Sequence, residues 1–197
     1  MPTYYSEEII NTTHLVPFSK YYKLDQFDCG IPEYNQFLID SADVFQNSGI
    51  TNTQLLLDNF TGNIIGYISL CMSSVKLTDN EKCSCHLESV PYKSVPALLL
   101  GKLAVDKNYR SKRKGYGSYL VAITRGFAAE INNNGIACRF VVVDADIQYN
   151  PNTPQFYRKN LFVPNESCGK QSHKTTFSMR LDIYNDGEER KDQAQAS

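Results

Sequence analysis

The sequence contains no apolar run long enough to cross a bilayer, and its first residues, MPTYYSEEII, lack the basic start and apolar centre of a signal peptide. It also lacks an internal repeat and both common nucleotide-binding signatures, Gly-x-x-x-x-Gly-Lys-Ser/Thr and Gly-x-Gly-x-x-Gly. The absence of a membrane-spanning run and of a signal peptide argues against a membrane-spanning or secreted protein, so we expect a cytoplasmic one.

The six cysteines are expected to be reduced, because disulfides are rare in the cytosol. A metal site is suggested by Cys83-Ser84-Cys85-His86. A Cys-x-Cys pair without a second pair of ligands is a weak signal, however. We therefore expect free thiols and no bound metal.

Length and composition predict one compact domain. A chain of 197 residues with 42% hydrophobic residues is long enough for one core and short for two. We assign the domain to residues 1–184 and expect the polar tail, residues 185–197, to be disordered.

The net charge of -1 conceals an uneven distribution. Residues 1–100 carry 5 basic and 11 acidic side chains, whereas residues 101–180 carry 13 basic and 5 acidic ones. A basic half can present a face that attracts the phosphates of a cofactor or of nucleic acid. Ordinary solvated surface is the alternative interpretation of the same charges.

The most informative stretch runs from Ala97 to Glu130. Its first part, Leu98–Val105, is a short apolar run that ends at Asp106, which is typical of a strand. A basic turn with two glycines follows at Lys112–Ser118. Apolar residues then recur three or four positions apart, as in a helix, at Leu120, Ile123, Phe127 and Ile131. The stretch therefore predicts a strand, a turn and a helix.

A turn that enters a helix through glycines leaves backbone N–H groups unpaired at one point, where the helix dipole adds partial positive charge. Gly115 and Gly117 allow a close approach to an anion because no Cβ intervenes. Lys112, Arg113 and Lys114 add full charges. We expect this turn to bind phosphate, although a basic surface turn that happens to hold two glycines fits the same residues.

The other segments alternate between helical and strand patterns. We expect an amphipathic helix from Pro32 that stops at Asn47-Ser48-Gly49, and then a hairpin of residues 53–57 and 64–71. Residues 76–95 show little periodicity and are expected to form a loop. Later elements are a strand at residues 138–143, a short helix at residues 153–160 capped by Thr153, and a strand at residues 177–183. This order predicts an α/β fold of the mixed α+β kind, with a mixed sheet and helices on both faces.

The run LGKLAVDKNYRSKRKGYGSYL resembles the acetyl-CoA-binding segment of the GCN5-related N-acetyltransferases. The family pattern Arg/Gln-x-x-Gly-x-Gly/Ala falls on Lys112, Gly115 and Gly117, where Lys112 departs from the usual residue but keeps a charged donor. The resemblance implies acetyl-CoA as cofactor and a mostly antiparallel sheet with a splayed centre. It also implies that backbone groups of Leu103 and Val105 contact the pantetheine arm and the acetyl carbonyl. The implied cofactor-binding residues are Leu103, Ala104, Val105, Lys112, Arg113, Lys114, Gly115, Tyr116, Gly117 and Ser118.

A second segment, TPQFYRKNLF at residues 153–162, resembles the family's Ala-x-x-Phe-Tyr-x-x-x-Gly-Phe, whose tyrosine lies near the CoA sulfur. The resemblance implies that Tyr157 is the general acid that protonates the leaving thiolate. A phenol with an ordinary pKa of about 10 suits a thiolate of comparable basicity. Leu161 stands where the family has glycine. The competing interpretation is that Phe156 and Tyr157 are ordinary packed aromatic residues.

No general base stands out in the sequence. If the expected loop at residues 76–95 forms a wall of the substrate site, His86 and Glu88 are candidates there for relaying a proton. Both are also common surface residue types. An amine of modest pKa can instead lose its proton to water.

The similarity to the family extends from about residue 20 to residue 165 and includes Phe27-Asp28-Cys29-Gly30. Over this range the sequence resembles the branch of the family that contains acetyltransferase toxins of toxin-antitoxin modules. Those toxins acetylate the amino group of aminoacyl-tRNA. An acidic N-terminal half and extra length at both ends count against that substrate.

We therefore expect an acetyl-CoA-dependent N-acetyltransferase in which a primary amine attacks the thioester directly. The expected acceptor is a small amine or a protein or peptide amine. The first alternative is toxin-like acetylation of aminoacyl-tRNA, with tRNA as a partner, and the second is a non-catalytic acyl-CoA-binding module. A homodimer is one option for its assembly, and an antitoxin partner is left open.

Overall fold

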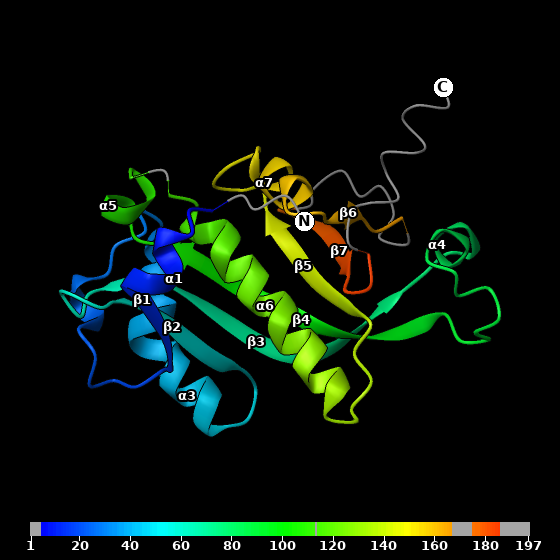
Figure 1. Ribbon diagram of the computed structural model, residues 1–197, viewed down its shortest axis with the longest axis horizontal. Helices are drawn as coiled ribbons and strands as arrows, with labels where there is room; N and C mark the ends of the chain where they lie inside the picture. The colour runs from blue at the N-terminus through cyan, green and yellow to red at the C-terminus, as the bar shows by residue number, and fades with distance from the viewer. Residues whose placement is uncertain (1–4, 113, 167–174, 186–197) are drawn as a thin grey trace. The chain divides into compact units, whose positions relative to one another are not determined.

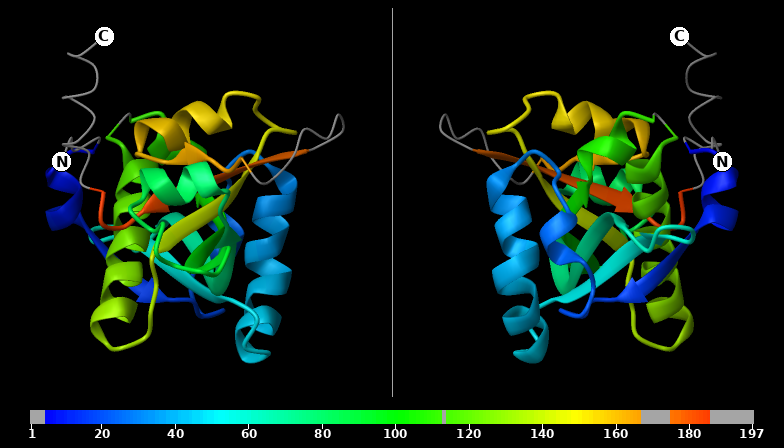
Figure 2. Two further views of the ribbon diagram at one scale, coloured as in Figure 1. Left: turned by 90° about the vertical axis from the view of Figure 1, so that its right-hand side faces the viewer. Right: turned by 90° about the vertical axis from the view of Figure 1, so that its left-hand side faces the viewer.

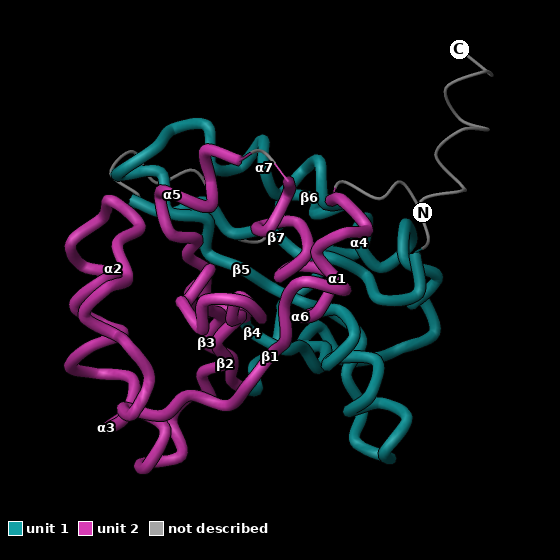
Figure 3. The backbone as a smooth tube through the Cα atoms, turned by 60° about the vertical axis from the view of Figure 1, so that its left-hand side comes forward, with its two compact units in different colours: residues 1–2, 72–99, 125–197 teal, residues 3–71, 100–124 magenta. Residues whose placement is uncertain are grey.

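The computed structural model describes residues 5–112, 114–166 and 175–185, and the chain divides into two compact units (Figure 3). Unit 1 contains residues 1–2, 72–99 and 125–197, and unit 2 contains residues 3–71 and 100–124. The single domain over residues 1–184 stays a prediction. The expected disordered tail lies outside the described residues from residue 186 onward.

The described residues form seven strands. They are β1 (Thr13–Pro17), β2 (Asn52–Asp58), β3 (Ile64–Lys76), β4 (Ser94–Val105), β5 (Phe140–Asp146), β6 (Val163–Pro164) and β7 (Thr176–Asp182). Their hydrogen bonds give the order β1-β2-β3-β4-β5-β7-β6, drawn in Figure 1. The β4–β5 pair is parallel, whereas β1–β2, β2–β3, β5–β7 and β6–β7 are antiparallel. The prediction of a mixed, mostly antiparallel sheet is confirmed.

The helical segments are mostly short. They are α1 (Glu8–Thr12), η1 (Leu24–Gln26), α2 (Pro32–Gln36), η2 (Phe37–Ser41), α3 (Ala42–Asn47), α4 (Asp79–Ser84), α5 (Lys107–Arg110), α6 (Tyr116–Asn133) and α7 (Thr153–Lys159). Figure 2 shows α2, η2 and α3 as one continuous column, which confirms the amphipathic helix expected there. Its middle is a π-helical turn, a rare geometry that hydrophobic periodicity does not reveal. None of the described helices is both long and apolar enough to span a membrane.

Unit 2 places helices on both faces of its strands. Leu55 and Tyr67 are fully buried in a cluster with Phe37 and therefore face the α2–α3 column. Gly66 faces the other way, since a Cβ added there would lie 3.0 Å from Cδ1 of Leu120 on α6. Successive residues of a strand point to opposite faces, so one strand supports both helical layers.

Unit 1 contains the other end of the sheet. Seven residue pairs align β5 with β7, from Phe140↔Asp182 to Asp146↔Thr176. Helix α7 packs on these two strands. A buried cluster that includes Val75, Val95 and Phe140 joins the first part of β4 to β5.

The prediction that residues 76–95 form a loop is wrong, because the segment contains α4. The helix begins with a capping box, in which the Thr78 side chain accepts from the Glu81 amide and the Glu81 carboxylate accepts from the Thr78 amide. The spacing Thr-x-x-Glu was visible in the sequence and would have predicted this helix start.

The N-cap residue of α7 is Asn152, one position before the Thr153 that the sequence predicted.

Four helices end with the same two backbone hydrogen bonds. The amide of the first residue after the C-cap donates to the carbonyl of the second-last helical residue, and the amide of the second residue after the C-cap donates to the carbonyl of the third-last one. In α6 the amide of Ile136 donates to Ile131, and in α7 the amide of Phe162 donates to Tyr157. This arrangement requires a positive φ at the residue after the C-cap, which favours glycine. The four residues are Gly49 (φ 67), His86 (φ 54), Gly135 (φ 86) and Leu161 (φ 69).

Candidate active site

The turn between β4 and α6 lies within unit 2. Strand β4 ends where the amide of Asp106 donates to the carbonyl of Ile65 on β3, at 2.8 Å. The Asp106 carboxylate then caps α5 by accepting from the Asn108 amide, at 2.8 Å. Gly115 has a φ of 86°, a left-handed conformation that suits glycine, and α6 begins at the next residue. The sequence prediction of strand, turn and helix is confirmed, with α5 as an additional helical turn.

The first amides of α6 precede the hydrogen-bonded ladder of the helix, as they do in any α-helix. The amide of Tyr119 donates to Gly115 O at 3.0 Å and so begins the helical ladder. Among the described residues, no backbone carbonyl accepts from the amides of Tyr116 and Ser118. A helix of 18 residues concentrates partial positive charge at this end. Backbone donors and dipole together favour an anion.

The cations of the turn are held in place by other side chains. The ammonium of Lys112 lies 4.2 Å from the centre of the Tyr109 ring. The ammonium of Lys114 is 2.8 Å from Oε1 of Glu8, and this hydrogen bond raises the pKa of Lys114. The carbonyl of Lys114 accepts from the amide of Ser6, which fastens the N-terminal segment to the turn. Arg113 lies outside the described residues.

Strand β4 carries the backbone groups of Leu103, Ala104 and Val105. The parallel pairing with β5 covers Ala97–Leu99, although β4 continues to Val105. On the other edge β3 lies very close, because a Cβ added to Gly66 would sit 2.6 Å from the carbonyl oxygen of Ala104. A ladder that stops partway along a strand is the backbone arrangement expected of a splayed sheet centre.

Tyr157 belongs to unit 1 and lies on α7. Its side chain is buried, and its ring packs edge-on against Phe156 and Phe162, with centroids 5.0 and 5.2 Å apart. Its carbonyl accepts from the amides of Asn160 and Phe162, which closes the helix end around it. The tyrosine is therefore fixed by its own helix terminus and by two aromatic neighbours. Leu161, at the position of the family's glycine, has the positive φ that this terminus requires.

His86 and Glu88 also belong to unit 1 and follow α4. The backbone of His86 provides the left-handed residue that ends this helix. The carboxylate of Glu88 accepts a hydrogen bond from the Cys83 thiol, and this contact raises the pKa of that thiol. Both residues thus have local contacts that account for their positions, and their role toward a substrate stays a prediction. The part of the chain that the structure describes contains no group of three His, Cys, Asp or Glu side chains suited to a metal.

Two contacts near the turn were missed by sequence reasoning. Asp28 forms an ion pair with Lys107 at 2.6 Å, and its carboxylate also accepts from the Gly30 amide at 2.8 Å. Tyr109 donates to the carboxylate of Asp58 at 3.0 Å. The partners of each pair are 79 and 51 residues apart, so no local pattern signals them.

No model of a protein family matches this sequence. Solved structures of the same fold do match it. A structure described as a bacterial toxin has a TM-score of 0.70 and 21% identity, with 87% of this chain and 90% of that chain covered. AtaT complexed with acetyl-methionyl-tRNAfMet has a TM-score of 0.68 and 20% identity, with 94% and 99% covered. A tyrosine-to-phenylalanine variant of KacT has a TM-score of 0.67 and 20% identity, with 86% and 95% covered.

These similarities define the class of fold. The chain has the fold of the GCN5-related N-acetyltransferases, as the resemblance of its turn segment predicted. Within that class, the matching structures named above are AtaT, KacT and a protein described only as a bacterial toxin. A further AtaT structure is bound to the C-terminus of the antitoxin AtaR and to acetyl-CoA. At these identities the similarity shows the fold alone.

Proposed function

We propose that the protein is an acetyl-CoA-dependent N-acetyltransferase that acts on a primary amine. The observation that carries this proposal is the turn between β4 and α6, where Gly115 has a positive φ and leads directly into the N-terminus of an 18-residue helix. The residues present fit the diphosphate of acetyl-CoA, since Lys112 and Lys114 add positive charge beside that N-terminus. AtaT, which shares this fold, has been solved with acetyl-CoA.

The roles proposed for the other residues come from the resemblance of their segments to the family. Backbone groups of Leu103 and Val105 would contact the pantetheine arm and the acetyl carbonyl, beyond the residues Ala97–Leu99 through which β4 pairs with β5. The amine nitrogen then attacks the carbonyl carbon, the carbon–sulfur bond breaks, and the Tyr157 hydroxyl gives its proton to the sulfur. The proton of the amine would leave to water, and a proton from water would restore the Tyr157 phenol, with no dedicated base assigned. The proposed acceptor is a small amine or a protein or peptide amine, and the proposed location is the cytoplasm.

A Tyr157→Phe variant tests the catalytic part of this proposal. It should lose turnover by about tenfold or more, because the general acid is removed, while its affinity for CoA stays near that of the unchanged protein. Tyr92→Phe is the matched control, since that side chain is 73% exposed. Equal turnover of Tyr157→Phe and the control would overturn the role of Tyr157. Failure of the unchanged protein to bind CoA would overturn the whole assignment.

A second acceptor is favoured by the structural neighbours. AtaT has been solved with acetyl-methionyl-tRNAfMet, and KacT with its partner in a complex with DNA. The alternative is therefore acetylation of the amino group of aminoacyl-tRNA, with an antitoxin as a second partner. Mass spectrometry after incubation with acetyl-CoA and charged tRNA, or with a panel of amines, separates the two acceptors. Expression in bacteria gives an independent answer, since growth arrest relieved by Tyr157→Phe supports the tRNA substrate.

A further inference from the structure

Tyr109 links the turn between β4 and α6 to the turn between β2 and β3, both in unit 2. It lies on α5, between the end of β4 and the turn, and its side chain is buried. Its hydroxyl donates to Oδ2 of Asp58, at the end of β2, across 3.0 Å. The residue therefore holds α5 against the turn between β2 and β3.

Asp58 is itself a fixed acceptor. Its other oxygen, Oδ1, accepts from the amides of Phe60 and Thr61 at 2.9 and 3.0 Å. Burial alone would raise the pKa of Asp58, but these amides and the Tyr109 hydroxyl outweigh burial and lower it. The carboxylate is thus charged at neutral pH, and hydrogen bonds to a charged acceptor are stronger than neutral ones.

The Tyr109 ring reaches both the start of α6 and a cation of the turn. Tyr116, the first residue of α6, packs edge-on against it with centroids 5.7 Å apart and an interplanar angle of 87°. Both residues are buried, with relative exposures of 7% for Tyr109 and 6% for Tyr116. The ammonium of Lys112 lies over the Tyr109 ring at 4.2 Å. The contact between Tyr109 and Tyr116 joins α5 to the first residue of α6, on either side of the segment that carries Lys112, Lys114 and Gly115.

We propose that Tyr109 is a positioning residue for the diphosphate of acetyl-CoA. Its hydrogen bond to Asp58 and its ring contacts hold Lys112 and the first amides of α6 in the arrangement that grips an anion. A flexible turn would have to be ordered when the cofactor binds, and that ordering costs affinity. This inference rests on the proposed function, because it assumes that the turn binds the diphosphate.

The test measures binding by calorimetry with two probes, CoA and pantetheine, which lacks the nucleotide and the diphosphate. In Tyr109→Phe the ring contacts remain and the hydrogen bond to Asp58 is lost, and the Kd for CoA should rise by about three- to tenfold. In Tyr109→Leu the contact with Lys112 is lost as well, and the rise should be larger. The affinity for pantetheine should be unchanged in both variants.

Tyr21→Phe is the matched control, because it makes the same chemical change at a residue that is 93% exposed. Asp58→Asn alone and combined with Tyr109→Phe gives a double-mutant cycle, in which the combined effect on the Kd should be smaller than the product of the single effects. Melting temperatures of all variants monitor folding.

An equal loss of affinity for CoA and pantetheine would overturn the inference, because it would reveal a general structural defect. Unchanged CoA affinity in both Tyr109 variants would overturn it too. If the unchanged protein binds CoA no better than pantetheine, the turn does not grip the diphosphate. The proposed function then fails at this site, and the inference fails with it.

Discussion

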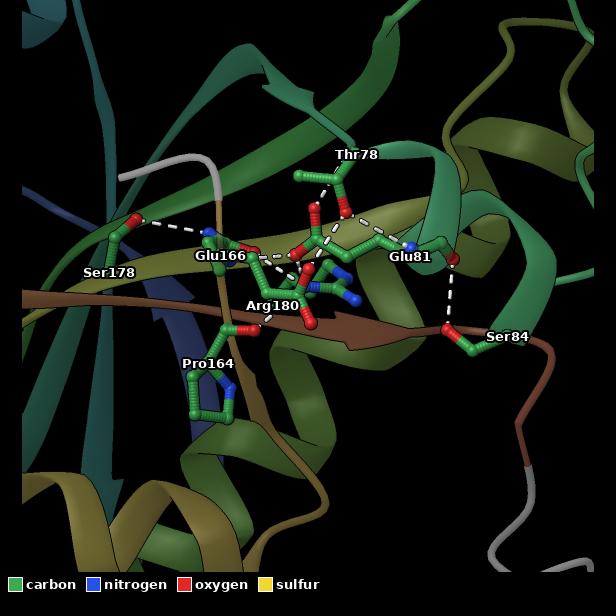
Figure 4. Close-up of polar contacts among 8 residues, drawn as sticks. Thr78, Glu81, Ser84, Pro164, Glu166, Ser178 and Arg180 are labelled. Atoms are coloured by element: carbon green, nitrogen blue, oxygen red, sulfur yellow. Dashed lines mark hydrogen bonds and ion pairs between the residues drawn. The ribbon is translucent and has the colours of Figure 1, made fainter. Parts of the chain in front are cut away.

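Glu81 and Arg180 form an ion pair that is almost completely withdrawn from water, with side chains 2% and 5% exposed (Figure 4). The carboxylate also accepts from the amides of Glu166 and Thr78, at 2.8 and 2.7 Å. The guanidinium also donates to the carbonyl of Pro164 at 2.8 Å. Residues 99 positions apart thereby fasten α4 to β6 and β7 within unit 1.

Removing one partner of this pair should be costly, because the other charge would stay buried without compensation. Glu81→Gln should lower the free energy of unfolding by about 3–5 kcal/mol. Asp43→Asn is the control, since its ion pair with Lys20 is 3.6 Å long and exposed, and its loss should be below about 1 kcal/mol. Urea unfolding at neutral pH measures both. Similar losses for the two variants would contradict the buried role of Glu81.

A methyl group at Gly66 should destabilise the protein, because it would collide with the backbone of β4. The added Cβ would lie 2.6 Å from the Ala104 carbonyl oxygen and 3.0 Å from Leu120. We expect Gly66→Ala to cost about 1–3 kcal/mol. Gly126→Ala is the control on α6, where nothing lies within 4 Å of the added Cβ, and it should gain about 0.5–1 kcal/mol. Thermal unfolding of both variants decides, and a neutral Gly66→Ala would contradict the close approach.

Leu161 should be improved by glycine, because it adopts a φ of 69° at the end of α7. A left-handed conformation costs a residue with a Cβ about 1–2 kcal/mol, and part of that is offset by the greater freedom of glycine in the unfolded chain. We expect Leu161→Gly to raise the free energy of unfolding by about 0.5–1 kcal/mol. Gly135→Ala, at the equivalent position of α6, should lower it. Changes of the same sign in both variants would refute this explanation.

The charge of Asp28 should make the free energy of unfolding depend on pH in the acid range. The hydrogen bond from Lys107 lowers the pKa of this carboxyl most, and those from Asn35 and the Gly30 amide lower it further. Because the folded pKa is lowered, the stabilisation is fully present above the unfolded pKa of about 4 and is lost as pH falls through the folded pKa. The stability difference between the unchanged protein and Asp28→Asn should therefore shrink as pH falls below about 4. Urea unfolding across this pH range checks the prediction, and a stability difference that stays the same at every pH would contradict it.

Most strands and helices could be predicted because their signals are local. Gly49 and Gly135 stop α3 and α6 at the positions that the sequence indicates, and the hairpin of β2 and β3 follows from its polar turn. Helix α4 was missed although Thr78 and Glu81 have the spacing of a capping box. Its short length gave no periodicity to detect, since six residues hold fewer than two turns.

The candidate site also has a part that could be predicted from the sequence and a part that could not. The glycines and cations of the turn are contiguous in the sequence, so their likeness to an acetyl-CoA-binding segment was visible without a structure. The supports of that turn were not visible. Asp58 and Glu8 reach it from segments 51 and 106 residues away, and no pattern within a segment reports a partner so distant.

Neighbouring residues alone define the strand, turn and helix around Gly115 and the polarity of that turn, because backbone conformation and charge there depend on local sequence. The contacts that hold the turn in place and the burial of charges depend on distant segments, as with Tyr109 on Asp58 and Arg180 on Glu81. The reason is that burial and long-range pairing arise when segments pack together.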